Sequence, residues 1–226
     1  MDAPTDESLI SAPLYPLFIK LDGVRVVVIG AGKVAVRKVE TLLEFGASLT
    51  VIAPEAEERI IDLADKGRVN YLRRAYVEGD LEGALLAVVA TSDRTVNESV
   101  ATEARKRAML VNVVDALDLC NCVVPSSLRR GRLQVAVSTG GASPSAAREL
   151  RLELEERLPD WWEAYLDFAA EARQLIKERI PDSAPARESM MKMIGSSAFR
   201  KRFAADERPT AEEAFAELSE IGIEAL

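Results

Sequence analysis

The sequence predicts an α/β fold: a doubly wound parallel sheet, followed by a small β segment and a helical C-terminal domain. Short apolar runs alternate with amphipathic stretches over the first half of the chain, as in sheets whose parallel strands are joined by helices. The first apolar run ends in a glycine-rich turn that leads directly into a helix. After Asp115 the alternation stops, and from Ser143 onward the pattern is helical to the end.

The elements of the predicted sheet follow one another in regular order. A short extended piece at residues 15–19 is expected at a sheet edge. Residues 24–29 indicate a parallel strand that is buried on both faces, because the centre of the run is apolar. The further strands are expected at 49–52, 69–72, 85–90 and 110–114. The helices between them are expected at 34–45, 54–66 and 94–107, and Pro54 is expected to open the second.

The rest of the chain predicts two further parts. Two strand-like pieces, 121–125 and 132–139, are joined by a basic turn at 129–131 and are typical of an antiparallel hairpin. The helical region that follows is interrupted by four prolines. We therefore expect a nucleotide-binding domain over 1–114, a β segment over 115–142 and a helical domain over 143–226.

The composition argues against several classes of function. Of 226 residues, 48% are hydrophobic, which is enough for one sizeable core and a smaller appendage. The net charge of −8 argues against a nucleic-acid partner, and no apolar run approaches the roughly 20 residues that span a bilayer. Cys120 and Cys122 are too close to pair without strain, so we expect reduced thiols, packed as small core residues, in a cytoplasmic protein. The absence of histidine excludes Ser-His-Asp hydrolysis and histidine-based zinc sites.

The first glycine turn has the composition of a dinucleotide-binding loop. Residues 30–35 read Gly-Ala-Gly-Lys-Val-Ala, the Gly-x-Gly-x-x-Ala pattern, between an apolar strand and a helix. Gly30 allows the tight turn, Gly32 lets phosphates approach the backbone, and Ala35 lets the helix lie close to its strand. Since a helix N-terminus attracts a pyrophosphate, the sequence predicts a Rossmann-like nucleotide site. The alternative is a strand–helix turn that binds no ligand.

Two further strand ends carry candidate cofactor residues. Glu55 lies about 20 positions beyond Ala35, the spacing of the acid that holds ribose hydroxyls, although a first-turn acid favoured by the helix dipole fits equally. No arginine immediately follows the second strand, which favours NAD over NADP. Thr91-Ser92-Asp93 follows the fourth strand at the edge where open α/β sheets bind ligands, although Ser92 or Asp93 also suits a helix cap.

Two loops are candidates for substrate chemistry. Asp115 follows the fifth strand at the same edge of the sheet. In a chain without histidine it is the leading candidate for proton transfer, and burial would favour its action as a base. The alternative is a loop Asp that only turns the chain. Residues 138–144 read Ser-Thr-Gly-Gly-Ala-Ser-Pro, a second glycine loop before a helix. Ser143 suits the N-cap and Pro144 the first helical position, so the loop is either an anion site or simply a well-formed helix start.

Together and in this order, the motifs resemble the siroheme-synthase dehydrogenase/chelatase family, that is, the precorrin-2 dehydrogenases. The resemblance covers about residues 14–158. The matching stretches are Val28-Ile29-Gly30-Ala31-Gly32-Lys33-Val34-Ala35-x-Arg37-Lys38, Val51-Ile52-Ala53-Pro54-Glu55, Ala90-Thr91-Ser92-Asp93 with Val96-Asn97, Asn112-Val113-Val114-Asp115, and Val135-Ala136-Val137-Ser138-Thr139-Gly140-Gly141-x-Ser143-Pro144. One departure is Thr139, where the family has serine.

The resemblance implies an NAD-dependent enzyme that oxidises precorrin-2 to sirohydrochlorin, and it leaves ferrous iron insertion open. It implies that Lys33, Val34, Pro54 and Glu55 contact the cofactor, and that Asp115 serves both dehydrogenation and metal insertion. It also implies a homodimer, in which the β segment is a dimerisation segment that builds the tetrapyrrole cleft with the helical tail and the partner chain.

The implied tetrapyrrole carries several carboxylates, whereas the chain is net acidic. Local cations must therefore dominate substrate binding, which charge screening over about 8–10 Å permits. The candidates are Arg129, Arg130, Arg132, Arg148 and Arg151, together with Thr139, Gly140, Gly141 and Ser143 of the loop that they flank. Two alternatives stay open: a sirohydrochlorin ferrochelatase with a vestigial NAD site, and a non-catalytic module that senses NAD or a tetrapyrrole.

Overall fold

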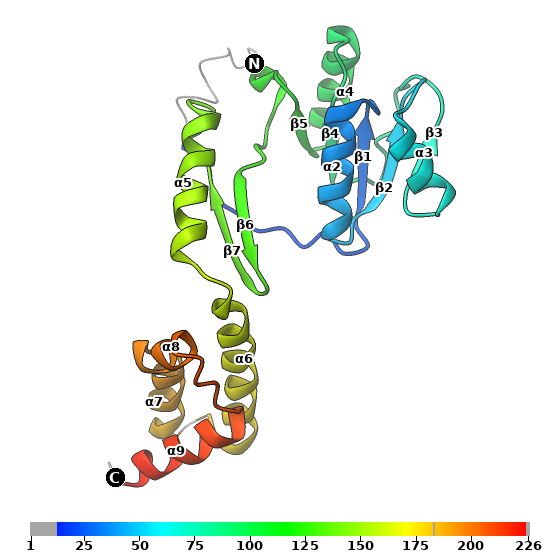
Figure 1. Cartoon of the computed structure of the whole chain (residues 1–226). Coiled ribbons are helices and arrows are strands. Elements are labelled where there is room, and N and C mark those ends of the chain that lie inside the picture. Colours follow the sequence, from blue (N-terminus) through cyan, green and yellow to red (C-terminus); the bar gives the residue numbers. More distant parts are fainter. Residues whose placement is uncertain (1–12, 183, 225–226) are drawn as a thin grey trace. The chain divides into compact units, whose positions relative to one another are not determined.

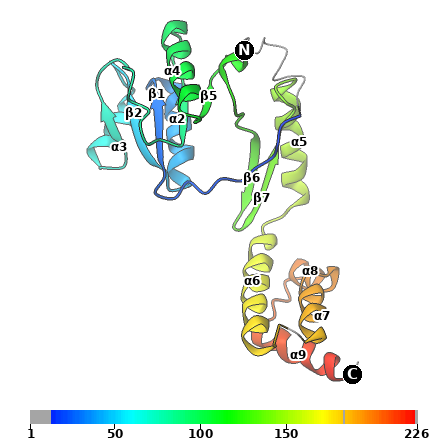
Figure 2. The same ribbon diagram turned by 180° about the vertical axis from the view of Figure 1, so that it is seen from behind.

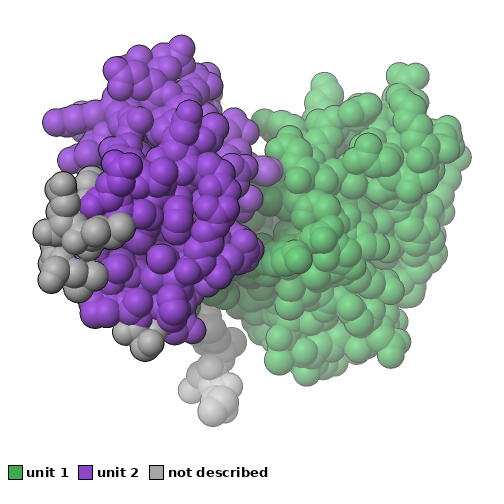
Figure 3. Space-filling model, turned by 90° about the horizontal axis from the view of Figure 1, so that it is seen from below, with its two compact units in different colours: residues 1–124, 139–143 green, residues 125–138, 144–226 purple. Residues whose placement is uncertain are grey.

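The computed structural model describes residues 13–182 and 184–224. The chain divides into two compact units, which Figure 3 shows in different colours. Unit 1 consists of residues 1–124 and 139–143, and unit 2 of residues 125–138 and 144–226. The predicted three-part division at residues 114 and 142 stays a prediction. Within the described ranges, no helix is both long and apolar enough to cross a membrane.

Unit 1 is built on a parallel sheet of five strands in the order β3-β2-β1-β4-β5 (Figure 1). The strands are β1 (Arg25–Ile29), β2 (Ser48–Ile52), β3 (Asn70–Leu72), β4 (Leu86–Val89) and β5 (Leu110–Val113). The predicted doubly wound sheet is confirmed, and every strand ends within one residue of its expected bounds. The strand order reverses between β1 and β4, and open sheets of this kind bind ligands outside the carboxyl ends at such a point.

Helices cover both faces of this sheet, which Figures 1 and 2 show from opposite sides. They are α2 (Lys33–Glu44), α3 (Glu58–Asp65) and α4 (Arg94–Lys106). Successive strand residues point to opposite faces, so Val26 and Val28 pack with buried residues of α2 and α3. Val27 and Ile29 pack instead with buried residues of α4. All four side chains are at most 3% exposed, which makes β1 the buried centre of the unit.

The connection from β3 to β4 has no helix and is held by a buried carboxylate on α4. Glu103 is only 3% exposed and accepts hydrogen bonds from the Tyr76 hydroxyl, the Gly79 N–H and the Arg107 guanidinium. Burial raises the pKa of Glu103, but these bonds outweigh it and hold the pKa below its usual value. The ionised carboxylate is therefore fully bonded and fixes the connection on this face of the sheet.

Two elements of unit 1 differ from the prediction. Pro54 does not open a helix, because α3 begins at Glu58. The intervening loop is tied to the glycine turn after β1, since the Glu57 N–H donates to the Ala31 carbonyl at 3.0 Å. The extended piece predicted at residues 15–19 belongs to neither sheet, so its assignment to a sheet edge is wrong.

Unit 2 begins with an antiparallel hairpin. Its strands are β6 (Ser126–Arg130) and β7 (Leu133–Val137). The first strand predicted for this hairpin, at 121–125, is therefore wrong, and the turn follows at Gly131, whose φ is +52°. The side chain of Asn121 explains the difference, because it bonds to two backbone groups near the start of β5, each at 2.7 Å.

The remainder of unit 2 is helical, as predicted. The helices are α5 (Pro144–Arg157), α6 (Trp161–Arg179), α7 (Pro185–Ile194), α8 (Ser197–Ala204) and α9 (Ala211–Glu224). Helix α5 packs on the hairpin, whereas α6 to α9 enclose a separate core around Tyr165, Phe168 and Ile176. The Tyr165 hydroxyl donates to the Ile194 carbonyl at 3.0 Å and so joins α6 to α7. Pro185 begins α7 rather than interrupting a helix.

Candidate functional site

The glycine turn after β1 has two glycines with different structural needs. Gly30 has φ +97°, and a Cβ there would lie 2.4 Å from the Ala90 carbonyl oxygen at the end of β4. Glycine is therefore required at this position to bring the ends of β1 and β4 together. Gly32 has φ −80°, and a Cβ added to it would meet no heavy atom within 4 Å. The fold alone does not require glycine at Gly32, whereas a ligand that approaches the backbone does.

The N-terminus of α2 is left without a side-chain cap. Its N-cap is Gly32, its first turn contains no acidic residue, and its first internal bond runs from the Val36 N–H to the Gly32 carbonyl. Helix α4 differs, because the Asp93 carboxylate accepts from the N–H groups of Thr95 and Val96. The cap predicted as one alternative for Asp93 is therefore present. An uncapped N-terminus beside the point where the strand order reverses is suited to a phosphate group.

The loop after β2 places Pro54 and Glu55 at the surface beside this turn. Both side chains are exposed, and the bond from the Glu57 N–H to Ala31 joins the loop to the glycine turn. Because α3 begins only at Glu58, Glu55 is not in a helical first turn. The helix-dipole explanation for Glu55 is therefore wrong, and the ribose role stays a prediction.

The end of β4 is held by a buried amide. The Asn97 side chain is 6% exposed, and its Nδ2 donates to the Thr91 carbonyl at 3.2 Å. The Thr91 hydroxyl accepts from the Asp93 N–H at 3.0 Å, so the loop containing Ser92 is tightly folded. Asn97 lies in one of the stretches that resemble the family, but the sequence pattern predicts no role for it. Its position six residues after Thr91, on the buried side of a helix, was the available clue.

Asp115 follows β5 in a turn closed by the Ala116 N–H and the Val113 carbonyl at 3.4 Å. Its φ of +58° lies in the left-handed region, which Asp tolerates better than most residues. The carboxylate is exposed, so the burial that would favour its action as a base is not present. Across the described ranges, no ion pair or side-chain hydrogen bond of Asp115 is present, which leaves both oxygens available.

The second glycine loop lies against the segment that follows Asp115. A Cβ at Gly141 would be 2.7 Å from the Cδ1 atom of Leu117, which begins the 3-10 turn Leu117–Leu119. The Thr139 hydroxyl donates to the Ser143 carbonyl and accepts from the Ser143 N–H, both at 3.0 Å, and so closes the loop. A Cβ at Gly140 would meet no heavy atom within 4 Å, so there is space beside its Cα. Unit 1 thus brings the second glycine loop, predicted to bind substrate, next to the segment that follows Asp115.

The arginines predicted to bind substrate fall into two groups. Three of them are paired with acidic side chains of unit 2, which largely neutralises them. The pairs are Arg130 with Glu155 and Asp160, Arg132 with Asp167, and Arg151 with Glu155. Arg129 and Arg148 are exposed, and neither forms an ion pair within the part of the chain that the structure describes. Arg130, Arg132 and Arg151 therefore already have acidic partners in the protein, and the role of the five arginines in substrate binding stays a prediction.

Two family models match the chain in tandem. A model described as "Putative NAD(P)-binding" matches residues 17–126, and one described as "Sirohaem biosynthesis protein central" matches residues 130–157. A siroheme synthase of Methylococcus capsulatus is 43% identical over 167 residues, which are 74% of this chain. The chain belongs to the siroheme synthase family. A siroheme synthase of Nitrosococcus oceani is 38% identical over 192 residues, or 85% of the chain.

The chain spans only part of these siroheme synthases, 35% of the first and 41% of the second. Among solved structures, "SirC, precorrin-2 dehydrogenase" aligns with a TM-score of 0.74 and 28% identity, over 92% of this chain and 100% of that chain. The predicted family and fold class are therefore confirmed. The NAD(P)-binding match includes the first glycine turn and Asp115, and the central match includes Thr139, Ser143 and Arg148.

Proposed function

We propose that this siroheme synthase family member is an NAD-dependent precorrin-2 dehydrogenase that forms sirohydrochlorin. The alignment with a solved precorrin-2 dehydrogenase over its whole length supports the proposal most strongly. The alignment extends beyond the nucleotide-binding part of the chain and into unit 2, so it covers more than a generic dinucleotide fold.

The residues at the carboxyl edge of the sheet fit a dinucleotide. Gly30 and Gly32 shape the turn, and the N–H groups of Lys33 and Val34 at the uncapped start of α2 would hold the diphosphate. Val34 is 36% exposed, an apolar side chain open to a ligand at this position. When bound, NAD supplies the two-electron acceptor that a dehydrogenation needs.

Further contacts to the cofactor would come from the neighbouring strand ends. Glu55 would bind the ribose hydroxyls through its exposed carboxylate, with Pro54 setting the direction of the loop. Thr91 and Ser92 would border the cofactor at the end of β4. A carboxylate at the ribose repels a 2′-phosphate, so we propose NAD rather than NADP as the cofactor.

Asp115 would accept the proton that leaves the tetrapyrrole during dehydrogenation. Its carboxylate is exposed and unpaired among the described residues, and a positioned carboxylate base contributes roughly 10²–10⁴-fold to rate. The loop with Thr139, Gly140, Gly141 and Ser143 would contact the substrate beside it, where there is space next to the Cα of Gly140. Arg129 and Arg148 would pair with substrate carboxylates.

We also propose a homodimer, which the distribution of exposed apolar side chains supports. Tyr15, Leu17 and Phe18 are 86%, 68% and 64% exposed, and Leu150 and Leu152 of α5 are 47% and 44% exposed. Several exposed apolar side chains within one short segment, as in residues 15–18 of unit 1 and in α5 of unit 2, favour burial against another protein chain. Light scattering coupled to size-exclusion chromatography tests this, and a monomer at micromolar concentration would contradict it.

The decisive experiment is an anaerobic assay of precorrin-2 with NAD and without metal. We expect NADH and sirohydrochlorin in equal amounts, and an Asp115→Asn variant should lose about 100-fold in kcat while the Kd for NAD changes less than about twofold. Iron insertion into sirohydrochlorin without any NADH formation would instead support a chelatase with a vestigial NAD site. NAD binding without turnover of either substrate would support a sensing module.

A further inference from the structure

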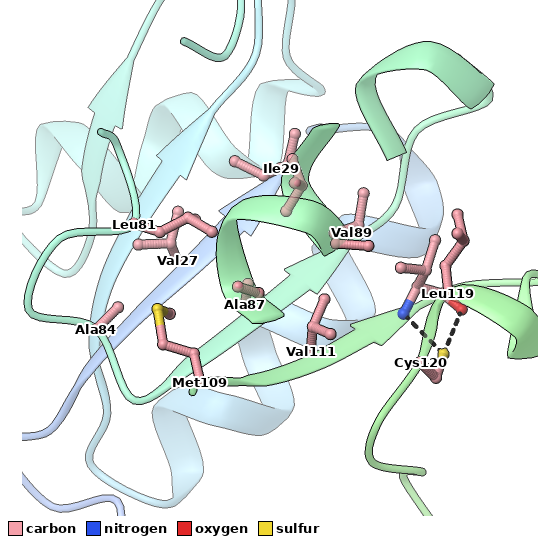
Figure 4. Packing of buried hydrophobic residues seen from close by; sticks show 14 of the residues in the cluster. Val27, Ile29, Leu81, Ala84, Ala87, Val89, Met109, Val111, Leu119 and Cys120 are labelled. Atoms are coloured by element: carbon pink, nitrogen blue, oxygen red, sulfur yellow. Dashed lines mark hydrogen bonds between the residues drawn. The ribbon is translucent and has the colours of Figure 1, made fainter. Parts of the chain in front are cut away.

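The segment after β5, which contains Asp115, is fastened back onto that strand by a buried thiol. The Val113 N–H donates to the Sγ atom of Cys120 at 3.1 Å, and the thiol lies 3.3 Å from the Val113 carbonyl oxygen and 3.4 Å from that of Ala116. Figure 4 shows Cys120 in the core cluster beside Leu119, with hydrogen bonds of its sulfur as dashed lines. Val113 and Ala116 are the two ends of the turn that contains Asp115. One side chain therefore bonds to both ends of that turn.

Two amide side chains hold the rest of the segment. The Asn112 Nδ2 donates to the Cys122 carbonyl at 3.1 Å, and the Cys122 N–H donates to the Val111 carbonyl at 3.4 Å. The side chain of Asn121 bonds to the Val111 N–H and the Met109 carbonyl. These bonds anchor residues 121 and 122 beside β5, so Cys120 is presented to the turn from a fixed base.

We propose that Cys120 is a positioning residue, which holds Asp115 in its left-handed conformation by bonding both ends of its turn. This inference rests on the role proposed for Asp115 above. A non-glycine residue at positive φ persists where surrounding contacts hold it, and the thiol provides such contacts. Cys120 does not touch the substrate in this scheme, because it is 4% exposed and packed in the core cluster of unit 1.

A protonated thiol is required, since its single proton donates to one of the two carbonyl groups while the sulfur accepts from the Val113 N–H. Burial among Leu119, Val111 and Val113 raises the pKa of Cys120, and the Val113 N–H only partly offsets this. The thiol therefore keeps its proton over the neutral range. Replacement by alanine removes donor and acceptor together and leaves the Val113 N–H and the Ala116 carbonyl short of one partner.

The experiment compares Cys120→Ala and Cys120→Ser with two controls from the same segment. Leu119→Ala removes a 7% exposed side chain from the same core cluster, and Cys122→Ala removes a thiol that bonds neither Val113 nor Ala116. For each variant, kcat and KM for precorrin-2, the Kd for NAD and the midpoint of urea unfolding are measured.

We expect Cys120→Ala to lower kcat by roughly 10–100-fold, because misplacement of a reacting group by about 1 Å has this effect. The Kd for NAD should stay within about twofold of the native value, since the glycine turn is untouched. Cys120→Ser keeps a donor and an acceptor and should recover most of kcat, and both control variants should keep kcat. If Cys120→Ala does not fold, Cys120→Val, which keeps apolar volume, should show the same loss.

Two outcomes overturn the proposal and are distinguishable. Unchanged kcat in Cys120→Ala, or a fall matched by Leu119→Ala, shows that the thiol only fills space, while Asp115→Asn still lowers kcat about 100-fold. Unchanged kcat in Asp115→Asn instead overturns the role proposed for Asp115, and with it the basis of this inference.

Discussion

Replacement of Gly32 by alanine separates the cofactor site from the fold. The added Cβ meets no heavy atom within 4 Å, and the backbone φ of −80° suits any residue. Alanine at an N-cap is less favourable than glycine by about 0.5–1 kcal/mol, and we expect no larger loss of stability than this. In the complex, however, the methyl group would occupy the space through which a phosphate approaches the helix N-terminus.

The expected loss of NAD affinity follows from the bonds that this approach permits. One hydrogen bond between a backbone N–H and a charged phosphate oxygen contributes about 1.5–3 kcal/mol, so its loss raises Kd by about 10–100-fold. Gly30→Ala is the matched control. Its Cβ would lie 2.4 and 2.8 Å from the carbonyl oxygen and carbon of Ala90, at φ +97°. Backbone strain of about 1–2 kcal/mol and overpacking of about 1–3 kcal/mol predict a destabilisation of about 2–5 kcal/mol.

Isothermal titration calorimetry with NAD and urea unfolding monitored by circular dichroism measure both effects. Gly32→Ala should remain folded and bind weakly, whereas Gly30→Ala should lose stability first. An unchanged Kd in Gly32→Ala would refute the placement of the diphosphate at this turn. If both substitutions destabilised the protein equally, the conclusion that the contact between β1 and β4 requires glycine at Gly30 but not at Gly32 would be refuted.

Two further predictions concern single carboxylates. Glu55→Gln should raise the Kd for NAD by about tenfold and that for NADP by less, measured by the same titration, and an equal change for both cofactors would contradict the ribose role. The Arg74 guanidinium, which bonds both Asp80 oxygens at 2.6 and 2.8 Å, holds the pKa of Asp80 below its usual value. This bond contributes its full stabilisation at pH values above the ordinary Asp pKa of about 3.9. The stabilisation is lost as the pH falls through the lower pKa that Asp80 has in the folded protein. Urea unfolding of Asp80→Asn should therefore show a deficit of about 0.5–1 kcal/mol at neutral pH that shrinks below about pH 4, and a constant deficit would count against it.

The sheet was predictable because its strands are short, apolar and buried on both faces. Val26, Val27 and Val28 need no tertiary information to indicate a central strand. The errors arose where distant contacts decide the local structure. The bond from Glu57 to Ala31 delays the start of α3, and the bonds of Asn121 to the start of β5 displace the first strand of the hairpin. Neither contact can be inferred from nearby sequence.

The positions of the candidate site could be predicted from the sequence where the backbone conformation allows only one residue type. Gly30 is an example, since its positive φ and its contact with Ala90 both demand glycine. The Cys120 bonds were not predictable, because bonds over four and seven residues in an irregular segment follow no helical or strand periodicity. The pairing of Arg151 with Glu155 was accessible, since the two are four residues apart on a helix, where opposite charges meet.

The charge distribution explains how an acidic chain can bind anions. With a net charge of −8, long-range electrostatic repulsion opposes the binding of both the proposed dinucleotide and the proposed carboxylate-rich substrate. The ion pairs of Arg130, Arg132 and Arg151 further reduce the free positive charge of unit 2. Anion binding must therefore rely on hydrogen-bond donors in direct contact with the ligand. Salt screens the repulsion from charges more than about 8 Å away but does not weaken these contacts. The uncapped α2 N-terminus at Gly32 provides such donors without any net charge, which is why backbone geometry, rather than surface charge, specifies this site.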